Sequence, residues 1–216
     1  MNNTPIDIFV HIPKCGGTTL HSIISQNYQP GEIYHYKVAG RRTSLTFKPG
    51  LLDIDNFLVG LNYYKDTVKC IVGHIPYGAH EYIDRPCHYF SMLREPAARV
   101  WSQFNAIVIN PYHYLYPTLA QYGFDLKAAL AGGVIEFCND QSRMVGDVNE
   151  YISVGLLEQF DVSIQNFSKA LGWAGRLEYS RLNVGAHGDV PEDVRRAIWA
   201  ANGEDVELYE KVKAKY

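Results

Sequence analysis

The sequence predicts an α/β fold of three layers, in which helices flank a central, mainly parallel sheet. Short apolar runs of strand type alternate along the chain with longer segments whose apolar residues recur at helical spacing. This alternation is typical of parallel strands joined by helical crossovers. The chain has 216 residues, of which 47% are hydrophobic and 20% charged, enough for a core that folds unaided. We therefore expect a single domain over residues 1–216.

Four short apolar runs are predicted to be strands, and three of them end at residues that interrupt a strand. Residues 7–12 are rich in Ile, Phe and Val and stop at Pro13, and residues 68–72 stop at Gly73. Residues 88–93 stop at the Arg94-Glu95-Pro96 corner, while residues 32–36 form a shorter candidate. Runs of this length bounded by Gly or Pro indicate buried strands.

Helices are predicted between and after these strands. The segment that starts at Pro96 has an apolar stripe through Val100, Phe104 and Ile107, and proline is favoured in a first helical turn. Gly132 and Gly133 end one later helix, and Asn202-Gly203 separates the last two. The remaining predicted helices cover residues 18–26, 51–64, 118–131, 156–171, 191–201 and 204–215.

The net charge and the absence of signal-peptide or membrane-span patterns limit the class of protein that we expect. The net charge of −3 argues against a general nucleic-acid binder but leaves room for a local basic pocket. The first ten residues, MNNTPIDIFV, lack the basic region of a signal peptide. No apolar run approaches the roughly 20 residues of a membrane span. We expect a cytoplasmic protein without a membrane span, and the oligomeric state stays open.

The four cysteines, at positions 15, 70, 87 and 138, form no CxxC pair and no zinc-type cluster. Cys70 and Cys87 lie within or beside apolar runs, so we expect them to be small buried hydrophobic residues. This pattern predicts reduced thiols and no metal site.

Three predicted strand ends carry polar residues suited to chemistry, namely the stretches PKCGGTT, GHIPYG and LREP. Ligands of open parallel sheets bind beyond the carboxyl ends of the strands. The convergence of these stretches at one edge therefore predicts a functional site there.

The first of these stretches has the composition of a phosphate cradle. Gly16 and Gly17 permit a tight turn that brings amides close to an anion. Thr18 and Thr19 would open a helix whose N-terminus favours negative charge, and Lys14 adds a full positive charge. The Walker A loop has its lysine after the last glycine, whereas Lys14 precedes the glycines. The order predicts a P-loop-like loop without ATP hydrolysis, and an ordinary strand–turn–helix corner is the alternative.

The LREP stretch offers a second anion contact. Arg94 stands at a strand end and could bind a phosphate through its guanidinium fork, and Ser102 in the next helix could complete the contact. An Arg-Glu-Pro corner that only caps a helix is the alternative.

Together these two stretches resemble the sulfotransferases that use 3′-phosphoadenosine 5′-phosphosulfate (PAPS), and in particular the carbohydrate type that includes the heparan sulfate uronyl 2-O-sulfotransferases. That family carries a "hIPKtgGTsl" loop, matched by residues 12–20, and an "lRdPxxRxxSxy" segment, matched by residues 93–104 with Arg99 at its second arginine. Weaker likeness continues through residues 139–147, 154–173 and 205–213. Cys15 replaces the commoner threonine, an exchange that leaves its backbone amide in place.

The resemblance implies a cofactor, PAPS, whose product is PAP, and the residues that bind it. The 5′-phosphosulfate would be held by Lys14, Cys15, Gly16, Gly17, Thr18 and Thr19, and the 3′-phosphate by Arg94 and Ser102. Residues 181–189 resemble a late cofactor-contacting segment of the family, although a plain surface loop fits equally. Arg41, Arg42 and Lys48 could form a basic edge, but a solvated turn is the better interpretation.

The third strand end is expected to hold the acceptor chemistry. An attacking hydroxyl must lose a proton, and histidine is the side chain best suited to take it near neutral pH. His74 follows its strand directly, where the resembled enzymes place a catalytic histidine in a "GH" context. Those enzymes often have His-x-His, whereas this chain has Val72-Gly73-His74. His80 could assist or replace His74, and Glu81 is the alternative base.

The resemblance thus predicts transfer of a sulfuryl group from PAPS to a hydroxyl, with His74 as general base and Lys14 stabilising the leaving group. The expected acceptor is a saccharide or glycoside, and the tyrosine-rich residues 109–122 could line a sugar cleft or form a buried aromatic corner. A P-loop kinase is one alternative function. It would need a lysine after the glycines and a carboxylate for magnesium. A module that binds PAP without catalysis is the other.

Overall fold

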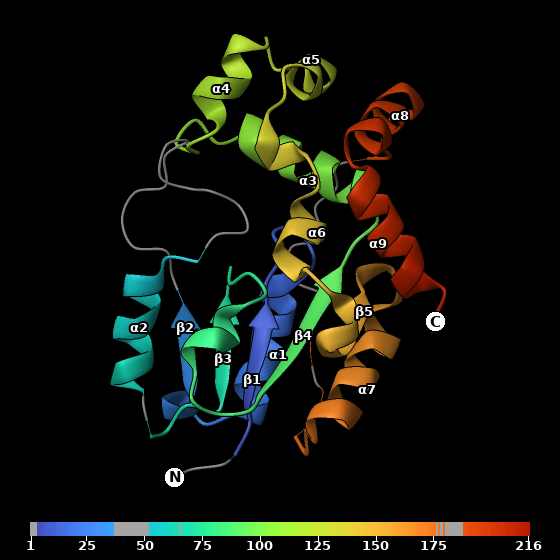
Figure 1. The fold of residues 1–216 in the computed structure, drawn as a ribbon. Helices are drawn as coiled ribbons and strands as arrows, with labels where there is room; N and C mark the ends of the chain where they lie inside the picture. Colours follow the sequence, from blue (N-terminus) through green and yellow to red (C-terminus); the bar gives the residue numbers. More distant parts are fainter. Residues whose placement is uncertain (1–3, 37–51, 65, 176, 178, 180–187) are drawn as a thin grey trace.

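The computed structural model describes residues 4–36, 52–64, 66–175, 177, 179 and 188–216 (Figure 1). Its centre is a five-stranded sheet in the order β2-β3-β1-β4-β5, and every adjacent pair is parallel. The strands are β1 (Ile6–Val10), β2 (Ile33–Tyr36), β3 (Cys70–Gly73), β4 (Cys87–Leu93) and β5 (Tyr151–Leu156). The predicted α/β fold with a parallel central sheet is confirmed.

The central strand β1 lies where the chain changes direction across the sheet. Phe9 of β1 pairs with Val72 of β3 on one side and with Phe90 of β4 on the other. The chain leaves β1 for β2 and β3 on one side, and then crosses to β4 and β5 on the other. A strand order that reverses in this way leaves a crevice at the carboxyl end of the central strand. The segments that follow β1, β3 and β4 therefore meet at that crevice.

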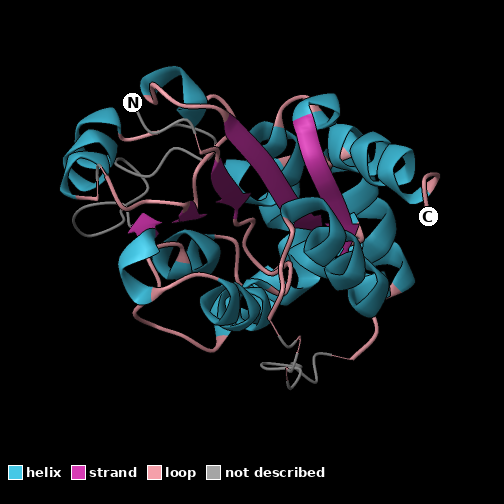
Figure 2. Ribbon diagram, turned by 90° about the horizontal axis from the view of Figure 1, so that it is seen from below, coloured by secondary structure: helices cyan, strands magenta, loops and turns pink. Residues whose placement is uncertain are grey.

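Helices cover the sheet and extend beyond it (Figures 1 and 2). Figure 1 shows α3, α4, α5 and α8 beyond the carboxyl ends of the strands, where they form what we call the helical cap. The other helices include α7, which packs against β5, and α2, which contacts β2. None of the helices in the described ranges combines the length and apolar character needed to cross a bilayer. The helices are α1 (Gly17–Asn27), α2 (Ile54–Tyr63), α3 (Pro96–Val108), α4 (Tyr116–Gln121), α5 (Leu126–Ala131), α6 (Asp140–Val145), α7 (Phe160–Leu171), α8 (Glu192–Ala201) and α9 (Gly203–Lys213).

Two apolar clusters form the interior. The larger one surrounds the sheet and includes side chains from all five strands, together with the buried thiols of Cys15 and Cys70. Cys87 is half-buried and packs against it. The second cluster fills the helical cap with residues such as Val100, Leu119 and Ile198. Cys15, in the loop after β1, belongs to the first cluster, and Ala97, at the start of α3, belongs to the second.

Two predicted segments are wrong in their boundaries. The predicted helix over residues 156–171 begins only at Phe160, because Tyr151–Leu156 forms the edge strand β5 and a short 3-10 turn, Leu157–Gln159, follows it. The predicted helix over residues 118–131 is two helices, α4 and α5. Gly123 and Phe124 have φ angles of 62° and 56°, and this left-handed backbone cannot continue a helix.

Candidate active site

The loop after β1 turns sharply into α1. Lys14 has a φ of 69° and Gly16 a φ of 75°, so the backbone enters the left-handed region twice within three residues. Such a conformation is uncommon for a residue with a side chain and is often found at functional sites. The first amides of α1, those of Gly17, Thr18 and Thr19, lie directly after this turn, where the helix dipole favours an anion. The predicted P-loop-like geometry is present.

Glycine is favoured at position 16 by the left-handed φ of 75° and at position 17 by the close approach of the His11 ring. A Cβ at Gly16 would lie 2.6 Å from Leu157 Cδ1, and a Cβ at Gly17 would lie 1.7 Å from His11 Nε2. Leu157 belongs to the turn after β5, and His11 follows β1. The loop is thus wedged between two side chains that fix its backbone.

Cys15 points away from the loop surface. Its side chain is buried, with Sγ 3.7 Å from the carbonyl oxygen of Pro13 and 3.6 Å from Oε1 of Gln141. Burial raises the pKa of the Cys15 thiol, so it stays protonated. Cys15 can therefore contribute only its backbone to a ligand, as its replacement of threonine suggested.

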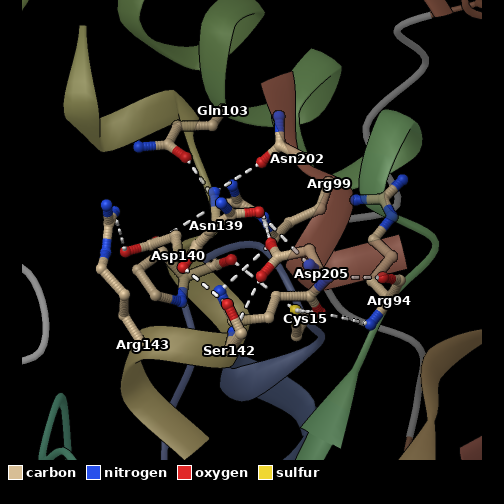
Figure 3. Close-up of polar contacts among 12 residues, drawn as sticks. Cys15, Arg94, Arg99, Gln103, Asn139, Asp140, Ser142, Arg143, Asn202 and Asp205 are labelled. Atoms are coloured by element: carbon tan, nitrogen blue, oxygen red, sulfur yellow. Dashed lines mark hydrogen bonds and ion pairs between the residues drawn. The ribbon is translucent and has the colours of Figure 1, made fainter. Parts of the chain in front are cut away.

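The two predicted anion contacts lie side by side. The guanidinium of Arg94 donates through Nη1 to the carbonyl oxygen of Lys14 at 3.2 Å, and Figure 3 shows Arg94 turned toward the loop that holds Cys15. Burial, followed by the nearby charge of Arg94, lowers the pKa of Lys14. Two cations held close together repel one another, and an anion bound between them would relieve that repulsion.

The residue after Arg94 explains how this corner is built. The carboxylate of Glu95 accepts hydrogen bonds from the amides of Ala97 at 3.1 Å and Ala98 at 2.7 Å, which caps the start of α3. The corner therefore does cap a helix, while Arg94 itself reaches back to the loop. Ser102 lies in α3 and is buried. No hydrogen bond joins Ser102 to Arg94 in the described part of the chain.

His74 directly follows β3 and is held by His11. Its Nδ1 lies 2.6 Å from the carbonyl oxygen of His11. A carbonyl can only accept, so Nδ1 carries the proton and Nε2 of the neutral ring carries the lone pair. The two rings also stack, with centroids 4.6 Å apart. Because His11 packs over Gly17, the candidate base is braced against the candidate phosphate loop.

The alternative bases lie in a different environment. His80 donates its amide to the hydroxyl of Tyr89 at 2.9 Å, its Nδ1 lies 3.1 Å from the same oxygen, and its ring packs on Tyr77. These contacts tie His80 to a cluster of tyrosines. Glu81 is exposed in the same short turn, Ala79–Tyr82. Of the three candidates, His74 is the one whose described contacts connect it to the loop.

Two contributors to the site were missed in the sequence. His11 had no motif that marked it as a partner of His74, because the two residues meet only once β1 and β3 pair. Gln141 contacts both Cys15 and Arg94, and its one signal is a position in the stretch NDQSRMVGD, which resembles the sulfotransferases weakly. Neither residue could be found from spacing alone.

Several predicted segments contribute little that the structure can place. Arg41, Arg42, Lys48 and residues 181–187 lie outside the described residues. In the tyrosine-rich stretch 109–122, Leu115 and Leu119 are buried in the helical cap, and the tyrosines at positions 114, 116 and 122 pack against it. Tyr112 is 98% exposed. Most of this stretch is therefore an aromatic corner of the cap.

The strand order, the loop and the paired cations define a P-loop-like α/β protein with a candidate site for a phosphorylated ligand. Among solved structures, the chain is similar to a sulfotransferase from Alicyclobacillus acidocaldarius, with a TM-score of 0.52 and 20% identity over 97% of this chain and 96% of that one. It is also similar to a mouse sulfotransferase in complex with PAP, with a TM-score of 0.45 and 15% identity over 94% of this chain and 66% of that one. The sequence matches no protein-family model and no curated protein. The first likeness establishes the fold.

Proposed function

We propose that this chain is a sulfotransferase that uses PAPS and transfers its sulfuryl group to a hydroxyl. The observation that carries the proposal is the direct contact between Arg94 and the Lys14 carbonyl at the end of β1. This contact places the two candidate anion sites next to each other, as a cofactor that carries both a 3′-phosphate and a 5′-phosphosulfate requires. The likeness in fold to the Alicyclobacillus acidocaldarius sulfotransferase supports the same proposal.

The residues present fit such a cofactor. Gly16 and Gly17 carry no side chain, so a ligand at the start of α1 would meet the backbone amides of Gly17, Thr18 and Thr19. Lys14 and Arg94 supply the positive charge that a phosphosulfate and a 3′-phosphate need. Lys14 and residues 15–19 would hold the 5′ end, and Arg94 with Ser102 the 3′ end.

The chemistry assigns separate tasks to the side chains. When bound, PAPS supplies the activated sulfuryl group. His74 Nε2 would accept the proton of the attacking hydroxyl, since its Nδ1–H is held by the His11 carbonyl. Lys14 would stabilise the negative charge that grows on the departing phosphate oxygen, and the amides of the loop would keep that phosphate aligned. The rate then arises from alignment and electrostatic stabilisation, as in phosphoryl transfer.

The acceptor is proposed to be a saccharide or glycoside. The proposal rests on the resemblance of residues 12–20 and 93–104 to the uronyl 2-O-sulfotransferases. A panel of hydroxyl compounds that includes uronic acid glycosides, phenols and lipids, assayed with labelled PAPS, would test it. Turnover only with phenols would contradict the saccharide assignment and leave sulfuryl transfer in place.

Binding separates this proposal from a kinase. We expect PAP to bind the wild-type protein in calorimetry and to raise its melting temperature, while Mg-ATP does neither. Binding of Mg-ATP in preference to PAP would favour the kinase. Binding of PAP without PAPS turnover across the whole acceptor panel would favour a module that binds the nucleotide without catalysis.

Substitution of the two catalytic candidates gives the first mutational prediction. His74→Ala and Lys14→Ala should each reduce turnover by about 10²-fold or more, the usual scale for a general base or a charge-stabilising group. His74→Ala should leave PAP affinity nearly unchanged, because the base contacts the acceptor rather than the cofactor. The matched control is His80→Ala, which should retain most of the activity. A His74→Ala protein that loses PAP affinity would overturn the base assignment.

A further inference from the structure

Gln141 lies between the two halves of the candidate cofactor site. It is the second residue of α6 and is fully buried. A buried carboxamide is costly unless its donor and acceptor both find partners. Both ends of this one do, and the partners belong to the two segments that would hold PAPS.

The carboxamide of Gln141 binds the backbone of Arg94 on both sides. Oε1 accepts from the Arg94 amide at 2.9 Å, and Nε2 donates to the Arg94 carbonyl at 2.9 Å. The pairing of β4 with β5 ends one residue earlier, at Leu93 and Leu156. The carboxamide of Gln141 thus forms the two backbone hydrogen bonds that a neighbouring strand would otherwise form with Arg94.

The same oxygen reaches the phosphate loop. Cys15 Sγ lies 3.6 Å from Gln141 Oε1, and Arg94 Nη1 returns to the Lys14 carbonyl at 3.2 Å. One side chain therefore contacts both the loop after β1 and the corner after β4. Gln141 therefore bridges the two segments without belonging to either of them.

Gln141 is itself held from the C-terminal part of the chain. The carboxylate of Asp205, in α9, accepts from the amides of Gln141 at 3.2 Å and Ser142 at 2.8 Å. Asn139 receives a further brace, because its amide donates to Asn202 Oδ1 at 2.8 Å. Figure 3 shows Asp205, Asn139, Ser142 and Asn202 gathered around the start of α6. The carboxamide is therefore fixed before any ligand arrives.

We infer that Gln141 is a positioning residue that sets Arg94 for the 3′-phosphate and keeps it in register with the 5′-phosphosulfate loop. The inference rests on the proposed function. Its distinguishing consequence is selectivity, since PAP and AMP share the adenosine and the 5′-phosphate but only PAP has the 3′-phosphate. Loss of Gln141 should weaken the binding of PAP much more than the binding of AMP.

The test compares both nucleotides by calorimetry on wild type and variants. Gln141→Leu removes the donor and the acceptor at similar volume, and Gln141→Glu replaces the donor with a second acceptor and adds a negative charge. We expect PAP affinity to fall by about tenfold or more in Gln141→Leu, on the scale of one hydrogen bond to a charged group, while AMP affinity changes little. Asn202→Ala is the matched control, because it disturbs the same buried network without touching Arg94 or Cys15. Asn202→Ala should leave the ratio of PAP affinity to AMP affinity (the PAP-to-AMP ratio) unchanged.

A double-mutant cycle shows whether Gln141 acts through Arg94. Arg94→Ala alone should reduce the PAP-to-AMP ratio, and adding Gln141→Leu to it should reduce the ratio no further. A Gln141→Leu protein that keeps the wild-type ratio would overturn the inference. If Gln141→Leu fails to fold, a Gln141→Glu protein with the wild-type PAP-to-AMP ratio would overturn the inference instead. Wild-type protein that binds PAP no better than AMP would overturn the proposed function itself, and with it the role of Gln141.

Discussion

His11, His21, His35 and His74 lie in a row from the candidate base to the edge strand β2. Successive ring centroids are 4.6, 5.0 and 6.1 Å apart, counted from His74 through His11 and His21 to His35. Rings this close cannot all be protonated without strong repulsion. Burial, followed by the charge of His35, lowers the pKa of His21 below its usual 6.5. The fold therefore favours the neutral form of the His21 ring.

The lowered pKa of His21 makes the stability of the fold depend on pH. His21 takes up a proton more readily in the unfolded chain than in the folded one, so its contribution is complete above pH 6.5 and is lost as the pH falls below that value. His21→Phe keeps a ring beside Phe9 and removes the titration. The melting temperature of the variant should fall less than that of wild type between pH 7 and pH 5. Parallel curves for the two proteins would contradict this assignment.

The start of α3 is the element on which the Arg94 corner depends. Glu95 caps the helix, and the same carboxylate accepts from Trp199 Nε1 at 2.8 Å and pairs with Arg195 at 3.4 Å. Trp199 and Arg195 both belong to α8. The side chain of Glu95 therefore caps α3 and also joins α8 to the start of α3.

Loss of the Glu95 cap should lower the stability of the folded protein. Glu95→Ala should lower the free energy of unfolding by about 1–2 kcal/mol, the range of an N-cap. Glu95→Asp should recover part of that loss, because aspartate is also a good N-cap although it is shorter. Trp199→Phe removes the indole donor and shrinks the ring that Arg195 packs over. A double-mutant cycle with Glu95→Ala should give a coupling of about 1 kcal/mol. Urea denaturation of the wild type and the four variants measures these free energies, and strict additivity of Glu95→Ala and Trp199→Phe would exclude the bond between Glu95 and Trp199.

Local signals explain which elements could be predicted. β3 ends at Gly73, β4 ends directly before the Arg94 corner, and β1 ends at Val10, three residues before Pro13, so the sequence marks the end of each strand to within a few residues. β5 has no such mark, because its apolar residues run directly into those of α7. Gly155 is informative only in three dimensions, since a Cβ there would lie 2.7 Å from Ser163 Cβ in α7. Close packing of β5 on α7, rather than propensity, selects the strand.

The site was predictable to the same extent. Lys14, His74 and Arg94 each follow a strand, and parallel strands bring their carboxyl ends to one edge. Gln141 reaches Arg94 across 47 positions of sequence, and Asp205 reaches Ser142 across 63. Such contacts exist only after α6 and α9 have packed. The sequence therefore could place the residues that we propose for the ligand at one edge of the sheet, but it could not reveal Gln141 and Asp205, which hold the Arg94 corner.

At the scale of the whole molecule, Arg99 connects α3 of the helical cap to α6 and α9. It is fully buried in α3, donates to Gln103 at 2.8 Å and to Asp140 at 3.2 Å, and lies 4.0 Å from Asp205. Figure 3 shows this arginine facing the two carboxylates. Burial raises the pKa of Asp140, and the charge of Arg99 opposes that rise. α3, α6 and α9 are thus joined by one charged group.

Removal of that group should destabilise the entire fold. Arg99→Met keeps much of the side-chain volume but leaves Asp140 and Asp205 buried without their cation, a change that costs about 3–5 kcal/mol at neutral pH. The cost should shrink as the pH falls. Without Arg99 the pKa of Asp140 in the folded state rises further above its unfolded value, so the folded protein gains protons and stability on acidification. Urea denaturation at pH 7 and pH 5 checks both effects. Adding Asp140→Asn and Asp205→Asn to Arg99→Met should recover part of the loss, whereas a cost independent of pH and of these changes would show that Arg99 acts by packing alone.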